Sequence, residues 1–350
     1  MTAPPALDAP FDALPDLATA VEAAVRWHFD PSTGSPFWLD LARSLPFDPL
    51  RDVTGPADLR RFPDVSDRLR TARVEDLVPK GFGDRVPLVF ESGGTTGAPK
   101  RVVELGFWHR TARWIDRCLD AHGVAAAGNW LYLGPTGPHV AGYAFGVVAA
   151  LRGGAFCTVD FDPRWVKRHP GQVDDYLDHV VGQATSLLRT QRISVLWATP
   201  PLLVAIADRP AVAELVASTV DTIVWSGVAA GPETLHLLDN EVFPDARVIG
   251  VYGNTVMGAA PQRPGPGCVF DPFAPHSVIE VFDPDTGVPV GYGERGRVRV
   301  HHLSADMFLP NVVERDLATR RPPAVPGGPD GVSDVVSARR TTGTFEEGVY

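Results

Sequence analysis

Cysteine and lysine are both scarce in this 350-residue chain. Its three cysteines, Cys118, Cys157 and Cys268, are far apart and form no Cys-x-x-Cys pair, so neither a disulfide framework nor a zinc site is indicated. No window approaches the ~20 apolar residues of a membrane span, and the first residues carry no basic segment followed by an apolar one. These absences indicate a protein of the reducing cytoplasm with no membrane partner.

The charge balance excludes a second class of partner. The formal net charge is −10 and the isoelectric point is near 5.4, and no lysine-rich block occurs, which argues against binding to nucleic acid or to an anionic membrane surface. Hydrophobic residues make up 44% of the chain, enough for a sizeable core. A globular protein that acts on a small molecule is therefore indicated.

One of only three lysines closes the most distinctive stretch of the sequence, which lies between an apolar run at 86–90 and the Val-rich run Arg101-Val102-Val103. The runs predict a β-hairpin or a strand–loop–strand unit. The loop between them is rich in glycine and hydroxyl side chains, which can bind a polyphosphate through inward-pointing N–H groups and hydroxyl donors. It is not a Walker A loop, because Pro99 directly precedes Lys100 and the required spacing is absent. The candidate phosphate-binding residues are Ser92, Gly93, Gly94, Thr95, Thr96 and Gly97, with Lys100 as a candidate catalytic residue.

Two alternatives stay open for this stretch. It can be a glycine-rich surface turn with accidental hydroxyls, and Lys100 taken alone can be a solvated lysine.

The stretch from Ser92 to Lys100 resembles the phosphate-loop signature of the acyl-adenylate-forming, or AMP-binding, superfamily, which includes acyl-CoA synthetases, luciferases and peptide-synthetase adenylation domains. Several short sequence segments within residues 35–81 are similar to the N-terminal region of the phenylacetate–CoA ligase and acyl-protein synthetase branch. The alternative is that these residues form an unrelated helical cap. The resemblance covers roughly residues 35–335 and implies ATP and Mg²⁺ as cofactors.

The order of predicted elements indicates an α/β fold. Continuous apolar strands alternate with helical patterns between 108 and 251, which predicts a parallel sheet covered by helices on both faces, and from 265 alternating patterns predict a small antiparallel β subdomain. We therefore expect the N-terminal core of the acyl-adenylate-forming fold. The expected segments are a helical lead at 1–85, an α/β body with the phosphate loop and the nucleotide and acid cleft at 86–264, the β subdomain at 265–319, and an irregular tail at 320–350.

Three glycine-bearing loops follow predicted strands, at 134–142, 226–231 and 252–257. Parallel sheets bind ligands at the carboxyl ends of their strands, so these loops are expected at one cleft. The resemblance implies that Tyr252 stacks near the adenine and that Thr255, a candidate catalytic residue, bonds the α-phosphate. The other candidate nucleotide-binding residues are Gly227, Val228, Ala229, Gly253, Asn254 and Asp316. The candidate acid-binding residues are His139, Gly142, Tyr143, Ser226, Val256 and Met257.

Three of these assignments have plainer alternatives. His139 is favoured as a wall of the acid pocket over an acid–base catalyst, because a histidine among apolar residues is more often a packing residue. The segment that begins at Ser226 also reads as the start of a helix at 231–233. Asp316 falls where the family places the aspartate that binds both ribose hydroxyls, but an ordinary surface aspartate fits as well.

Two departures from the family pattern bear on activity. Val256 stands where the family usually carries a glutamate that helps to bind Mg²⁺, so metal binding has to be weaker, supplied by phosphates and water, or lost. We therefore nominate no metal ligand. The family's mobile C-terminal domain, with its second lysine, has no counterpart before Tyr350, so we expect a lone adenylating core, an enzyme completed by a partner, or a binding remnant.

The sequence thus predicts ATP-dependent activation of a small carboxylic acid as its AMP ester in specialised-metabolite biosynthesis, with transfer to an amine, a thiol or a carrier protein. Truncated family members that tailor phenazine-type antibiotics are similar. An aromatic acid is favoured on Trp225, His139 and Tyr143, residues that could equally be core. The alternative is a non-catalytic nucleotide- or acid-binding remnant.

Overall fold

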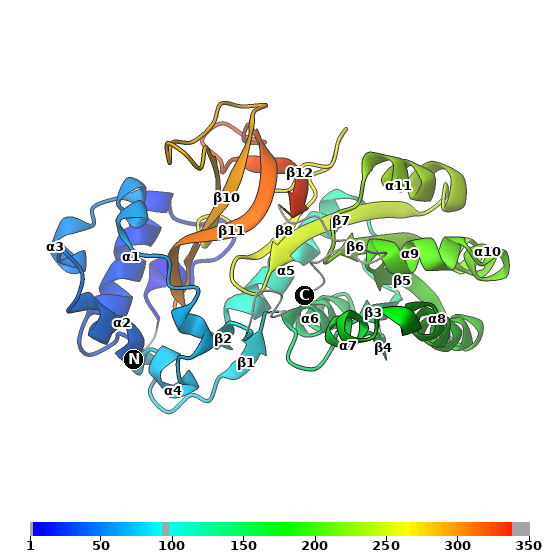
Figure 1. Ribbon diagram of the computed structural model, residues 1–350, viewed down its shortest axis with the longest axis horizontal. Coiled ribbons are helices and arrows are strands. Elements are labelled where there is room, and N and C mark those ends of the chain that lie inside the picture. Colours follow the sequence, from blue (N-terminus) through cyan, green and yellow to red (C-terminus); the bar gives the residue numbers. More distant parts are fainter. Residues whose placement is uncertain (1–2, 93–97, 338–350) are drawn as a thin grey trace. The chain divides into compact units, whose positions relative to one another are not determined.

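The computed structural model describes residues 3–92 and 98–337 (Figure 1). Within them the chain forms two compact units. Unit 1 holds residues up to 110, the short segment 255–258, and residues from 271 onward, and unit 2 holds 111–254 and 259–270. Among the helices of these described ranges, none is long and apolar enough to cross a membrane.

Unit 2 is built on a six-stranded sheet of order β4-β3-β5-β6-β7-β8 (Figure 1). The five strands from β4 to β7 in this order pair in parallel. Their middle residues, such as Leu131, Leu196 and Val224, are fully buried, as a sheet covered on both faces requires. The strands are β3 (Asn129–Gly134), β4 (Phe156–Asp160), β5 (Ile193–Ala198), β6 (Thr222–Ser226), β7 (Arg247–Asn254) and β8 (Gly258–Pro261).

The direction of the chain reverses next to β3. From β3 it moves outward to β4, and from β4 it returns past β3 to β5. Because crossovers between parallel strands are right-handed, this reversal puts α6 on one face of the sheet and α8 on the other. The α-helices between Phe107 and His236 are α5 (Phe107–Ala121), α6 (Val140–Leu151), α7 (Pro163–Arg168), α8 (Val173–Thr190), α9 (Pro200–Ala207), α10 (Pro210–Thr219) and α11 (Pro232–His236). The α/β fold predicted from the sequence is confirmed.

Unit 1 combines short helices with two small antiparallel sheets. Its helices are α1 (Leu17–Phe29), α2 (Pro36–Ala42), α3 (Pro49–Asp52) and α4 (Val74–Leu77). One sheet is the hairpin of β1 (Leu88–Glu91) and β2 (Arg101–Glu104), and the other has the order β12-β11-β10-β9. The strands of the latter are β9 (Ser277–Phe282), β10 (Arg295–Leu303), β11 (Phe308–Arg321) and β12 (Gly331–Ser337). The predicted hairpin around the glycine-rich loop is therefore confirmed.

The two longest of these helices begin where the sequence supplies caps. The Asp16 carboxylate accepts a hydrogen bond from the Thr19 N–H at 2.7 Å at the start of α1. Ser35 caps α2, and Pro36 follows at the first helical position, where its missing N–H costs nothing.

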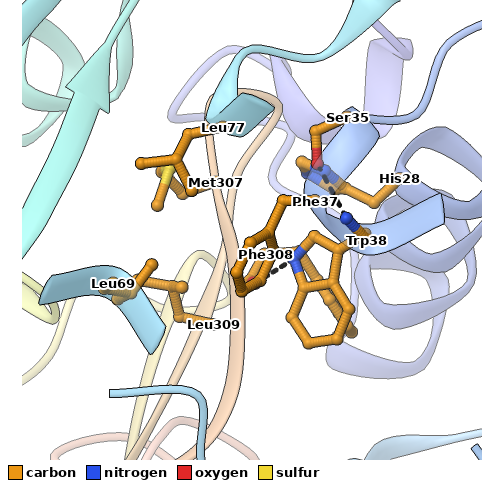
Figure 2. A pocket seen from close by; sticks show the side chains of 9 residues that line it. All are labelled: His28, Ser35, Phe37, Trp38, Leu69, Leu77, Met307, Phe308 and Leu309. Carbon is orange, nitrogen blue, oxygen red and sulfur yellow. Dashed lines mark hydrogen bonds between the residues drawn. The ribbon is translucent and has the colours of Figure 1, made fainter. Parts of the chain in front are cut away.

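Aromatic packing joins α1 and α2 to β11. Trp38 of α2 donates its indole N–H to the Phe308 carbonyl at 2.8 Å, and the two rings lie edge to face with centroids 5.3 Å apart. Figure 2 shows this contact beside a cavity of about 10 Å³, close to the minimum that holds one water molecule. The cavity is lined mainly by apolar side chains, so it is a packing gap in the core of unit 1 rather than a ligand site.

The C-terminal region contains a strand that was not predicted from the sequence. The sequence predicts irregular structure from 320, whereas Gly331–Ser337 forms β12 and pairs with the end of β11. The proline- and glycine-rich residues 322–330 form only the connection between the two strands. Buried Val332 and Ser333 show that β12 has a core-facing side, a property that a short segment with polar neighbours does not reveal. Residues 338–350 lie outside the described part of the chain.

Gly81 provides a test of the packing in unit 1. A Cβ at this position would collide with the indole of Trp27, which is buried and donates to the Ala305 carbonyl at 2.9 Å. We expect Gly81→Ala to lower the free energy of unfolding by about 1–3 kcal/mol, measured by chemical denaturation. Gly55→Ala is the matched control: its Cβ meets nothing within 4 Å, so the change should stay within about 0.5 kcal/mol. Equal effects of the two variants would contradict this packing.

Candidate functional site

The neck of the glycine-rich loop is closed by two reciprocal hydrogen bonds. The Ser92 N–H donates to the Lys100 carbonyl at 2.9 Å, and the Lys100 N–H donates to the Ser92 hydroxyl oxygen at 2.9 Å. They continue the ladder of β1 and β2, whose last pair is Glu91 opposite Arg101. Ser92 and Lys100 are therefore held together at the mouth of the loop, whereas Gly93, Gly94, Thr95, Thr96 and Gly97 lie outside the described residues.

Lys100 faces a carboxylate. Its Nζ lies 3.9 Å from Oε1 of Glu314 on β11, and only 14% and 15% of the two side chains are exposed. Sequence reasoning singled out Asp316, two residues further along β11, and missed this pair. Because 214 positions separate the two residues in the chain, no local pattern could have revealed it.

The structure brings Thr255 to the base of the same hairpin. Thr255 is almost fully buried, and its hydroxyl donates to the Glu91 carbonyl at 3.5 Å. Within unit 1, three predicted residues thus meet around one turn: Ser92 and Lys100 at the neck and Thr255 behind β1. Their roles toward a nucleotide stay predictions.

Val256 and Met257 are core residues, with 2% and 0% of their surface exposed. The Val256 carbonyl accepts a hydrogen bond from Nδ1 of His302 at 2.6 Å, and Nε2 of that ring accepts from the Ser304 hydroxyl at 2.8 Å. Burial lowers the pKa of His302 to about 3, so the ring is neutral and the Nδ1–H is fixed on the carbonyl. The apolar side chain of Val256 offers no oxygen to Mg²⁺.

A search for clusters of metal-binding side chains in the described part of the chain also finds none. In residues 3–92 and 98–337, no group of three or more histidine, cysteine, aspartate or glutamate side chains is placed to hold a metal ion.

Two buried carboxylates lie where the chain leaves the hairpin for α5. Glu104, the last residue of β2, accepts from the Trp108 N–H at 2.8 Å, and Asp306 accepts from the Phe107 N–H at 3.0 Å and from the Leu105 N–H. Anionic groups at a helix start are stabilised by its exposed N–H groups. Even so, burial and then the neighbouring Asp306 raise the pKa of Glu104 to about 8. Burial also raises the pKa of Asp306, although Arg85 opposes this rise.

In unit 2, the predicted loops share one edge of the sheet. β3 ends at Gly134, β6 at Ser226 and β7 at Asn254, and these are the carboxyl ends of parallel strands. The chain reversal described above lies between β3 and β5, the position at which open α/β sheets commonly bind ligands. The loop after β3 is tied to β4, because Asp160 accepts from both the N–H and the hydroxyl of Thr136 at 2.8 Å.

The predicted acid-binding residues of unit 2 lie at the end of the loop after β3 and at the start of the loop after β6. His139 is buried and precedes α6, whose first turn contains Gly142 and half-buried Tyr143. A Cβ at Gly142 would lie only 3.2 Å from the Pro135 carbonyl, so a glycine allows α6 to approach the loop closely. Ser226, at the end of β6, is 9% exposed.

The remaining nucleotide candidates divide between the units. Gly227 has φ +90°, a backbone conformation that favours glycine, and is followed by buried Val228 and half-buried Ala229. The ring of half-buried Tyr252 has its centroid 6.0 Å from that of Phe270, and Gly253 and Asn254 complete β7. Asp316, in unit 1, is half-buried on β11 opposite Ser337. Their nucleotide-binding roles stay predictions.

A sequence model of the AMP-binding enzyme family matches residues 84–304, more than half of the chain. The chain belongs to the AMP-binding enzyme family. These adenylate-forming enzymes activate carboxylic acids. The matched segment contains the β1–β2 hairpin, the sheet of unit 2 and Thr255. A search of curated proteins finds no match to the chain.

Solved structures of 2-hydroxyisobutyryl-CoA ligase have a similar fold. Its complex with 2-HIB-AMP and CoA in the thioesterification state superposes with a TM-score of 0.68 at 15% identity, covering 95% of this chain and 70% of that one. The open conformation with the same ligands gives 0.65 at 15% identity, covering 91% and 72%. The postadenylation state with R3-HIB-AMP gives 0.65 at 15% identity, covering 90% of this chain but only 65% of that one. At such identity the likeness shows the fold alone.

The raised pKa of Glu104 makes the free energy of unfolding depend on pH. Because its pKa is raised from 4.5 to about 8 in the folded state, the folded chain binds more protons than the unfolded chain between these values. The contribution to the free energy of unfolding is therefore full below pH 4.5 and is lost as the pH rises toward 8, by up to about 1.4 kcal/mol per pH unit. In Glu104→Gln we expect this fall to be clearly shallower, as measured by denaturant unfolding at pH 5, 6.5 and 8.

Glu22→Gln is the control for this experiment, because Glu22 lies on α1 with 60% of its side chain exposed and should keep the wild-type pH dependence. An unchanged slope in Glu104→Gln would show that this carboxyl ionises normally in the folded protein.

Proposed function

We propose that the chain binds ATP and converts a small carboxylic acid into its acyl-adenylate. In this reaction an oxygen of the acid attacks the α-phosphorus, the bond from that phosphorus to the bridging β-phosphate oxygen breaks, and pyrophosphate leaves. The observation that carries the proposal is the hydrogen-bonded neck of Ser92 and Lys100 in a chain of the AMP-binding family. The neck fixes a lysine at the mouth of a loop rich in donors.

The residues act by positioning and by charge. The Lys100 ammonium opposes the negative charge of the β- and γ-phosphates, and the loop from Ser92 to Gly97 donates hydrogen bonds to them. Thr255 donates to the α-phosphate, Tyr252 stacks on the adenine and Asp316 accepts from the ribose hydroxyls. Because Val256 cannot ligate Mg²⁺, no step depends on a metal bound at that position.

The acid is proposed to bind beside the loops at the carboxyl edge of the unit 2 sheet, with His139, Gly142, Tyr143 and Ser226 as walls. An aromatic acid fits an edge that carries His139 and Tyr143. The activated acyl group then passes to an amine, a thiol or a carrier in specialised-metabolite biosynthesis in the cytoplasm. The CoA bound to 2-hydroxyisobutyryl-CoA ligase supports a thiol as one such acceptor.

A binding protein without catalytic activity is the second candidate. The buried, apolar Val256 favours it, because the residue removes a metal ligand that the family normally has. Such a remnant would bind AMP, ATP or the acid tightly, yet it would exchange no pyrophosphate.

Exchange of labelled pyrophosphate into ATP, measured with a panel of acids chosen by thermal stabilisation in the presence of ATP, separates the two candidates. We expect acid-dependent exchange in the wild type and a loss of about 100-fold or more in Lys100→Ala, because one donor to developing phosphate charge is removed. Lys80→Ala is the matched control, since the Lys80 ammonium is exposed and donates to the Pro31 carbonyl at 3.1 Å, away from the glycine-rich loop in the sequence. Ligand binding with no exchange for any acid would favour the remnant.

Substitution of His139 tests whether this residue only lines the acid pocket or acts as an acid–base catalyst. If the buried ring only shapes the acid pocket, His139→Phe should keep the exchange kcat within about tenfold and change mainly the KM for the acid. A general acid or base would lose about 10²–10⁴-fold in kcat at every acid concentration. A collapse of kcat with an unchanged KM would therefore refute the assignment as a wall.

A further inference from the structure

The ion pair of Lys100 and Glu314 differs in geometry from that of Arg60 and Glu280, which also lies in unit 1. Arg60 and Glu280 meet in a two-point contact at 2.7 and 3.0 Å, with the geometry of paired hydrogen bonds. Lys100 and Glu314 stay 3.9 Å apart, too far for a hydrogen bond. Their attraction is therefore Coulombic and does not fix either side chain in one geometry.

Glu314 also keeps an unused acceptor. Its Oε1 is buried and makes no hydrogen bond to any residue of the described ranges. A buried oxygen without a donor is costly unless a charge compensates it. The Lys100 ammonium supplies this compensation across the gap, whereas the nearby Arg297 donates to the main-chain carbonyl of Glu314 at 2.8 Å.

Glu314 lies in a β-bulge of β11. On β10, Arg297 and Arg299 are two residues apart, but their partners on β11 are Leu317 and Val313, four apart. Two extra residues are thus accommodated in β11 between 313 and 317, where Glu314 and Asp316 both lie. Bulges are common next to active sites, where they redirect a side chain out of the regular alternation.

We propose that Glu314 is a built-in competitor for Lys100: its carboxylate neutralises the lysine while no nucleotide is bound, and a polyphosphate has to displace it. This inference rests on the proposed function, because it assumes that Lys100 binds phosphates. Glu314 is thus a positioning residue that sets the affinity for the nucleotide. The negative charge of Glu314 keeps the affinity for free polyphosphate low, which favours release of pyrophosphate after the adenylate forms.

The test measures binding by calorimetry, with ATP and inorganic tripolyphosphate as separate probes. The variants form a double-mutant cycle of Lys100→Ala, Glu314→Gln and the double variant. Removal of the competing charge should tighten binding of both probes by about three- to tenfold in Glu314→Gln. In the Lys100→Ala background the same change should have no effect, because the competition acts through the lysine.

Two further variants serve as controls for misfolding and for a general effect of net charge. Glu314→Asp keeps the charge but shortens the side chain by one methylene, so it should give a smaller gain and serves if Glu314→Gln fails to fold. Glu22→Gln removes one exposed negative charge from another ion pair of unit 1 and should leave both affinities unchanged.

The outcomes separate the inference from the function on which it rests. If Lys100→Ala weakens binding but Glu314→Gln leaves it equal or weaker, the competitor role is refuted and the nucleotide site stands. A gain that persists without Lys100 also refutes the role, since it would show direct repulsion of phosphate. If the wild type binds neither probe, or Lys100→Ala binds both equally well, the inference and the proposed nucleotide site fall together.

Discussion

The proposed chemistry depends on the pair of hydrogen bonds that joins Ser92 to Lys100. A loop rich in glycine has a large conformational entropy, and it can present donors to a phosphate only if its two ends are fixed. The antiparallel register of β1 and β2 supplies the fixed ends, and Thr255 adds support behind Glu91. The lysine is consequently placed by backbone geometry, while its charge is left to interact with whatever anion is nearest.

Buried carboxyl groups recur around this hairpin. Glu314 faces the lysine on one side of the loop neck, and Glu104 and Asp306 lie where β2 gives way to α5. Glu104 and Asp306 accept hydrogen bonds from main-chain N–H groups, yet burial raises the pKa of both carboxyls. The Oε1 of Glu314 has no hydrogen bond within the described residues, and an unpaired buried acceptor is unfavourable for stability taken alone.

Sequence reasoning found the elements whose signal is local. The parallel strands were visible as apolar runs, and the hairpin was visible because its glycines and hydroxyls lie within a few residues. The Lys100–Glu314 contact was not visible, since its two residues are far apart in the chain. The strand β12 was not visible either, since it is short and follows a proline- and glycine-rich segment. Nor did any local pattern around Val256, a residue singled out from the sequence, indicate that its carbonyl accepts a hydrogen bond from His302.

The division of the chain into two units has a consequence for how the protein can be taken apart. Within the described residues the polypeptide passes from one unit to the other at 110, 254, 258 and 270, so each unit is assembled from separated stretches of chain. No single proteolytic cut releases either unit whole, and a fragment that ended at Asn254 would lack the strand β8 at the margin of its sheet. Synthesis must therefore proceed well beyond the family's phosphate loop and central strands before either unit has all of its parts.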